Sequence, residues 1–241
     1  MTKGTVILAA LLALGTGSAA QSAVIGFVNN PTGNAADFAN HLAANGASVT
    51  TVIDFESHPL GSLDGNFYAP QGVTMSIVTP FLQTVMDITG IPSGSLDCPC
   101  STGEGPFPLT RALVYGDQVS LTVNFANAIA AIGMLTGDHY DPFGTDPITI
   151  EAFTGLNGTG TSLGSVQSFP RNYQLGYSYF MGLASTTNDI RSIVLTDGFS
   201  GTSDGVDLDN FQIAMVGVPE PATLGVLAMG VVGMLGLRRR R

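Results

Sequence analysis

The chain has 241 residues, of which 18 are acidic and eight are lysine or arginine, so its formal net charge is −10. Five of the basic residues lie near the ends of the chain, namely Lys3 and the four arginines at 238–241. The body between them, residues 21–221, keeps three arginines and all the acids, which gives 3 − 18 = −15. Such a body is repelled by phosphate backbones and anionic membranes, which argues against nucleic-acid binding. Divalent cations and neutral glycans remain compatible with this charge.

The first 20 residues have the three regions of a secretory signal peptide. Lys3 is the basic start, residues 6–14 are the apolar run, and small residues at 15–20 form the cleavage region. We expect cleavage after Ala20 or Ser22. The apolar run is too short to span a membrane comfortably, so an uncleaved N-terminal anchor is the weaker interpretation.

One helix is expected at residues 35–45, at the start of the body. Asn34 can cap it, Gly46 can end it, and Phe38 and Leu42 would form its buried face. Strands are expected at residues 50–56, 72–77, 119–125, 129–135, 148–153, 163–167, 179–184, 190–196 and 206–215.

The remaining pattern predicts an all-β domain at residues 24–216. The clearest strand is at 119–125, where Val, Leu, Val and Phe alternate with Ser, Thr and Asn. The chain also has 31 glycines, well above the ~7% average, which predicts many tight turns. Nine to eleven short strands separated by turn signals predict an antiparallel two-sheet sandwich.

Cys98 and Cys100 are the two cysteines of the chain. Outside the cytoplasm a disulfide between them is the default expectation, and it would close a very small ring with a modest effect on stability. Metal ligation and pairing between two molecules are the alternatives.

Two groups of three aspartates fall at loops or strand starts: Asp138, Asp141 and Asp146, and Asp204, Asp207 and Asp209. Calcium prefers several carboxylate and carbonyl oxygens, which either group can supply. The second group is the better candidate for a structural Ca²⁺, the one cofactor that the sequence suggests. Leu208 and Phe211 are three residues apart, so a bulge is expected near Asp209 and Asn210. The alternative is that these acids cap turns and solvate loops.

An aromatic stretch lies at residues 173–180, beside Arg171. Tyr173 and Tyr177, with Arg171, are candidates for contact with a sugar ring. Tyr179 and Phe180 would point to opposite faces of a strand, so at least one of them is expected in the core. The chain has no tryptophan, which weakens the case for sugar binding.

Residues 201–205 match the G-x-S-x-G pattern around Ser203. That nucleophile elbow needs a strand, a turn and then a helix, whereas Ser203 precedes a strand-like segment. We therefore predict no catalytic residues and no enzymatic activity, with a secreted hydrolase as a remote alternative.

The C-terminus has three parts: Pro219-Glu220-Pro221, sixteen uncharged residues at 222–237, and Arg238, Arg239, Arg240 and Arg241. Sixteen helical residues span about 24 Å, slightly less than the roughly 30 Å hydrocarbon core of a bilayer. The terminal arginines can snorkel to the headgroups and hold the end of the chain on the cytoplasmic side. The body would then stay outside.

This layout resembles the PEP-CTERM sorting signal of Gram-negative bacteria, here at residues 218–241. The resemblance implies recognition and cleavage near the motif by an exosortase, after passage through the secretion machinery and a transient stay in the inner membrane. It also implies delivery to the cell surface or extracellular matrix, in association with exopolysaccharide and biofilm. An ordinary single-pass anchor is the alternative.

The body resembles the jelly-roll domains of PEP-CTERM proteins and, more distantly, galactose-binding-like modules. The resemblance is carried by the order of short segments: 54–56, 72–74, 123–125, 131–133, 148–153 with Gly158 and 163–164, 180–183 and 206–211. It implies a fold class without a ligand. We therefore expect a non-catalytic surface or matrix protein, with a calcium-assisted carbohydrate-binding module as the alternative.

Overall fold

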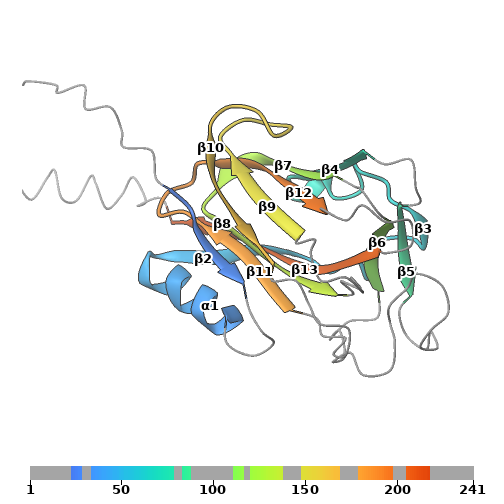
Figure 1. Cartoon of the computed structure of the whole chain (residues 1–241), viewed down its shortest axis with the longest axis horizontal. Coiled ribbons are helices and arrows are strands. Elements are labelled where there is room, and N and C mark those ends of the chain that lie inside the picture. Colours follow the sequence, from blue (N-terminus) through green and yellow to red (C-terminus); the bar gives the residue numbers. More distant parts are fainter. Residues whose placement is uncertain are drawn as a thin grey trace, which may run out of the picture.

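The computed structural model describes residues 23–28, 34–78, 83–87, 111–116, 120–137, 148–168, 179–197 and 205–217. In this part of the chain, strands form two sheets in which every neighbouring pair is antiparallel (Figure 1). The predicted two-sheet sandwich with one short N-terminal helix is confirmed. The signal peptide and the C-terminal hydrophobic segment lie outside the described residues. No helix within those residues has the length and apolar character needed to cross a membrane.

The larger sheet has the strand order β1-β11-β8-β13-β6-β5-β3, and β2 also pairs with β13. Its strands are β1 (Ile25–Val28), β2 (Ala47–Ile53), β3 (Gly61–Ser62), β5 (Gln83–Asp87), β6 (Arg111–Gly116), β8 (Ala131–Gly137), β11 (Tyr179–Ala184) and β13 (Gly205–Val216). The smaller sheet has the order β10-β9-β12-β7-β4. Its strands are β4 (Val73–Val78), β7 (Ser120–Ile129), β9 (Ile148–Phe153), β10 (Ser162–Gln167) and β12 (Ile190–Asp197).

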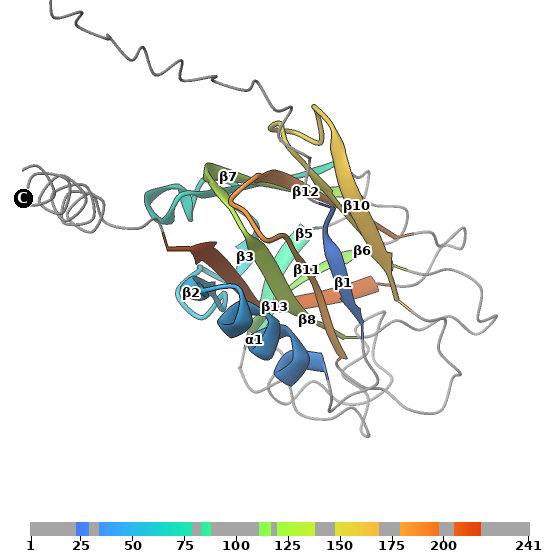
Figure 2. The ribbon, with the colours of Figure 1, turned by 90° about the vertical axis from the view of Figure 1, so that its left-hand side faces the viewer.

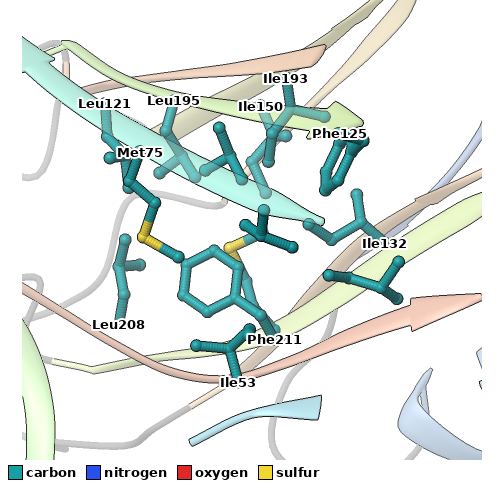
Figure 3. Packing of buried hydrophobic residues seen from close by; sticks show 14 of the residues in the cluster. Ile53, Met75, Leu121, Phe125, Ile132, Ile150, Ile193, Leu195, Leu208 and Phe211 are labelled. Atoms are coloured by element: carbon teal, nitrogen blue, oxygen red, sulfur yellow. The ribbon is translucent and has the colours of Figure 1, made fainter. Parts of the chain in front are cut away.

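The main core lies between the two sheets. On β7 the residues predicted to alternate do so, because Leu121, Val123 and Phe125 are buried while their neighbours are partly exposed. They meet buried side chains of the larger sheet, among them Ile53 and Phe211 (Figure 3). Truncating a fully buried phenylalanine such as Phe211 typically costs about 3–5 kcal/mol, so this interior accounts for much of the stability of the fold.

Helix α1 (Asn34–Ala44) covers the outer face of the larger sheet, beside β1, β2, β8 and β11 (Figure 2). Phe38 and Leu42 are buried against that face, as predicted. The Phe38 ring lies 5.1 Å from that of Phe180, centroid to centroid. Gly133 of β8 makes room for both rings, because a Cβ there would collide with Phe180. Gly46 ends the helix with φ = 65°, a left-handed conformation that favours glycine.

Candidate functional site

Strand β13 changes its partner on one edge halfway along its length. Residues 205–208 pair with β6, whereas residues 211–216 pair with β2. On its other edge, β13 pairs with β8 from Asp207 to Ala214, and the register shifts between Asp209 and Gln212. This shift confirms the bulge predicted near Asp209 and Asn210. Asn210 has φ = 52°, a conformation that asparagine tolerates better than most residues.

We call the point where β13 changes its partner from β6 to β2, near Asp209 and Asn210, the junction. The segment that follows β2 turns sharply there. Phe55 is fully buried and has φ = 56°, which is unusual for a bulky residue. The Asp54 carboxylate accepts a hydrogen bond from the Glu56 amide at 3.2 Å, and the His58 amide donates to the Phe55 carbonyl at 3.0 Å. The strand predicted at residues 50–56 therefore ends at Ile53, since the left-handed backbone at Phe55 cannot continue a ladder.

Arg111, the first residue of β6, holds this turn against the sheet. Its Nη1 atom donates to the carbonyls of Glu56 and His58 at 2.8 and 2.7 Å, and its amide donates to Glu56 Oε1 at 2.9 Å. Hydrogen bonds from a charged donor are roughly twice as strong as neutral ones. Arg111 thus ties together two segments that lie 53–55 residues apart in the sequence.

His58 is buried in the same turn with both ring nitrogens engaged. Nδ1 lies 2.6 Å from the Pro59 carbonyl, which can only accept, so Nδ1 carries a hydrogen. Nε2 accepts a hydrogen bond from the Asp64 amide at 3.1 Å. The ring also packs on Phe67, with 4.7 Å between centroids. These contacts give His58 a structural role in the turn.

Asp209 is the most unusual residue of the junction because it is completely buried and only half satisfied. Its Oδ1 atom accepts a hydrogen bond from the Asn210 amide at 2.6 Å, while Oδ2 has no partner. Burial raises the pKa of Asp209 to about 8; the Asn210 amide lowers it, and Asp54 and Glu56 raise it further. The carboxyl group therefore keeps its proton at neutral pH, which avoids the cost of a buried unpaired charge.

Tyr68 is a second buried polar group near the same acids. Its hydroxyl makes no hydrogen bond of acceptable geometry, although the nearby Ser57 side chain lowers its pKa. Burial is the main cause that raises the pKa of Tyr68 to about 12, and Asp54 and Asp209 add to it. The Tyr68 hydroxyl and Asp209 Oδ2, which both lack a hydrogen-bond partner, thus share Asp54 as a charged neighbour. Buried polar groups of this kind are commonly met by an ordered water or an ion.

The junction contains part of the predicted calcium group. Of that group, Asp209 is described in full, Asp207 through its backbone pairing with Gly137 and Val114, and Asp204 lies outside the described residues. In the part of the chain that the structure describes, no three His, Cys, Asp or Glu side chains are arranged to hold a metal ion. A cation at Asp209 would therefore depend on backbone oxygens or on residues elsewhere.

The other predicted site residues lie outside the described residues. They are the glycan candidates Arg171, Tyr173 and Tyr177, the cysteines Cys98 and Cys100, the aspartates at 138, 141 and 146, Ser203, and the sorting motif with its terminal arginines. Glu56, His58, Tyr68 and Arg111 were not singled out as site residues in the sequence. The sequence pattern gives little indication of this group, because its residues come together only through the pairing of β13 with both β2 and β6.

Comparison with known families places the C-terminus in a defined class. Residues 217–241 match the family model of the PEP-CTERM protein-sorting motif. The match covers about a tenth of the chain and confirms the signal predicted from Pro219-Glu220-Pro221 and its basic tail. It identifies a chain with an exosortase-type sorting signal, which implies a protein sorted to the surface. No curated protein matches the chain.

Among solved structures, the fold is similar to the K2 cleaved adhesin domain of Lys-gingipain, with 11% identity, a TM-score of 0.46, and coverage of 68% of this chain and 98% of that one. The K3 domain of Lys-gingipain from Porphyromonas gingivalis has 9% identity and a TM-score of 0.40, covering 70% and 99%. The CBM22-1 xylan-binding domain of Paenibacillus barcinonensis Xyn10C has 14% identity and a TM-score of 0.37, covering 72% and 97%. These likenesses concern the general β-sandwich arrangement and carry no argument about a ligand.

Proposed function

We propose that this chain is an exported, non-catalytic protein of the cell surface or extracellular matrix of a Gram-negative bacterium. Residues 1–20 would direct export, residues 24–216 would form one extracellular domain, and residues 218–241 would hold the precursor in the inner membrane until an exosortase cleaves it. The sorting-motif match at residues 217–241 is the observation that carries this proposal. Association with exopolysaccharide or biofilm is part of it and follows from the class of signal.

The direct test replaces Pro219 and Glu220 with alanine in a strain that makes the cognate exosortase. We expect the double variant to accumulate uncleaved in the inner membrane, because the motif read at the membrane boundary is lost. The matched control replaces Pro70 and Gln71, an exposed Pro-polar pair of the η1 turn (Ala69–Gln71), and should be processed normally. Unchanged processing of the motif variant would refute the sorting proposal.

A calcium-assisted glycan-binding module is the second candidate, favoured by the unpartnered Oδ2 of buried Asp209 beside Asp54 and Glu56. A cation there would let Asp209 ionise without an unpaired buried charge. Arg171, Tyr173 and Tyr177 remain the proposed sugar contacts. The test measures thermal unfolding and glycan-array binding with CaCl₂ and with chelator, for the natural chain and D209N. Loss of both a calcium-dependent rise in Tm and sugar binding in D209N supports this candidate, and absence of both in the natural chain rules it out.

A further inference from the structure

The C-terminal end of β13 is fastened to its neighbours up to the residue where the sorting signal begins. Asn188 holds Val216 through two hydrogen bonds: its Nδ2 donates to the Val216 carbonyl at 3.0 Å, and its Oδ1 accepts from the Val216 amide at 2.8 Å. The next amide, of Gly217, donates to the Gly46 carbonyl at 3.3 Å. The ordered chain therefore continues to Gly217, and the folded body adds almost no length to the segment that links it to residue 222.

The tether between the body and the hydrophobic segment is short. Only Val218, Pro219, Glu220 and Pro221 separate Gly217 from residue 222. Four residues reach at most about 14 Å when fully extended, and about 12 Å in the polyproline conformation that prolines favour. The polar headgroup layer of one leaflet is about 5–8 Å thick. When residues 222–237 occupy the bilayer, the end of β13 must lie at its surface.

The same end of the sandwich also receives the N-terminal segment. Ile25 of β1 pairs with Ala184, and Ala184 pairs with Ala131, the first residue of β8 after the turn at Ala130. The amide of Val24 donates to the Leu163 carbonyl at 3.1 Å. Figure 1 shows β3 and β5 at the opposite end of the long axis from α1. Both membrane-directed segments of the precursor are thus attached to one end of the body.

This end, which we call the exit end, consists of the turn at residues 45–46, Ala130, the loop at 185–189 and Gly217. Asp189 is the only charged side chain among these residues, all of which the structure describes. Its Oδ2 accepts a hydrogen bond from the Thr187 hydroxyl at 3.0 Å. The exit end therefore carries one formal negative charge in a body of charge −15, and anionic headgroups would repel it only weakly.

From these observations we infer that the exit end is the surface by which the precursor body lies against the lipid headgroups while its sorting motif is presented for cleavage. The inference rests on the proposed function, since it requires the C-terminal segment to be in the membrane. It adds a defined orientation: the loop at 185–189 faces the bilayer, and β3 and β5 point away. Asn188 is the positioning residue that keeps the tether at four residues.

The absence of tryptophan from the chain permits a clean test with single-tryptophan variants of the full precursor. T186W places the probe on the exposed tip of the exit end. L60W replaces an exposed leucine next to β3, which connects through β5 and β6 to Leu208. Leu208 is eight residues before Val216, or about 26 Å along the strand. The precursors are reconstituted in phosphatidylcholine vesicles that contain a lipid with a nitroxide on its headgroup.

We expect the headgroup nitroxide to quench T186W at least about twofold more strongly than L60W, given the reach of the tether. Inserting about 20 Gly/Ser residues after Gly217, a coil of roughly 25 Å, should remove most of this difference. Equal quenching of the two probes in vesicle-bound precursor would overturn the orientation while leaving the sorting proposal intact. A second result would also overturn the orientation: the headgroup nitroxide quenches T186W only weakly, and the tryptophan becomes shielded from solvent only when the exosortase is added. This result would assign the exit end to contact with the enzyme. Failure of the precursor to sediment with the vesicles would overturn the proposed function itself.

Discussion

Two regions of the same strand treat their polar groups in opposite ways. At its C-terminal end, both backbone polar groups of Val216 are hydrogen-bonded to the Asn188 side chain. At its midpoint, Asp209 is buried with one carboxylate oxygen unpartnered, beside a residue with positive φ. Buried polar groups are nearly always satisfied in native proteins, so an exception calls for a specific explanation. The C-terminal end of β13 therefore holds the chain in place. At the midpoint of the strand, the Asp209 carboxylate needs a proton or a bound ion to offset its burial.

The largest expected effect concerns the pH dependence of the midpoint. The pKa of Asp209 is about 8 in the folded protein and near 3.8 in the unfolded chain, so between these values the folded state binds more protons. The free energy of unfolding should therefore fall as the pH rises from about 4 to about 8, by an amount on the order of 3–5 kcal/mol. Urea unfolding of the processed protein across this range measures the fall.

In D209N the stability lost over this range should shrink markedly, because the amide has nearly the same shape but does not titrate. D64N is the matched control, since Asp64 is exposed and its Oδ1 accepts the Asn66 amide, a bond that asparagine can keep. A natural protein whose stability is flat between pH 4 and 8 would contradict the burial argument for Asp209.

The second effect concerns the turn that borders the midpoint. R111A removes two charged hydrogen bonds to the carbonyls of Glu56 and His58 and should lower the free energy of unfolding by about 3 kcal/mol. R191A is the comparison variant, because the buried Nε of Arg191 has no hydrogen-bond partner. Chemical denaturation of both variants checks this order; an equal loss of stability would show that Arg111 acts only through its charge.

The smallest effect is expected at the fastened end. N188A leaves the amide and carbonyl of Val216 without their partners and should cost about 1–2 kcal/mol, less than R111A because the lost hydrogen bonds are neutral whereas those of Arg111 have a charged donor. Hydrogen exchange should speed up at Val216 and Gly217 and stay unchanged at Ile213, which remains paired within the sheet. Exchange that is unaltered at Val216 would show that β2 alone holds this end of the strand.

Local sequence pattern predicted much of the fold. Alternation identified β7, the spacing of Phe38 and Leu42 identified the buried face of α1, and the three-residue step from Leu208 to Phe211 identified the bulge. These features depend on residues close together in the chain. The pattern did not predict β1, β3, β5 or β6, which lack a clear alternation.

The junction itself was only partly predictable. Asp209 was identified because it lies in an acidic group, but its proposed partners Asp204 and Asp207 followed from sequence proximity alone. Burial and the charges of Asp54 and Glu56, more than 150 residues earlier, dominate its environment in the fold. The clamp of Arg111 on residues 56–58 likewise arises from sheet pairing. Such contacts are set by topology, which the sequence pattern does not specify.

The central claim is that the chain is processed at both ends and that only its body reaches the surface. Intact-mass measurement of the protein released from, or extracted from, the cell surface tests this most directly. We expect the mass of a chain that begins at residue 21 or 23 and ends near residues 218–221, together with any group added on transfer. A mass that retains residues 222–241 would contradict the claim and leave the C-terminal segment as an ordinary anchor.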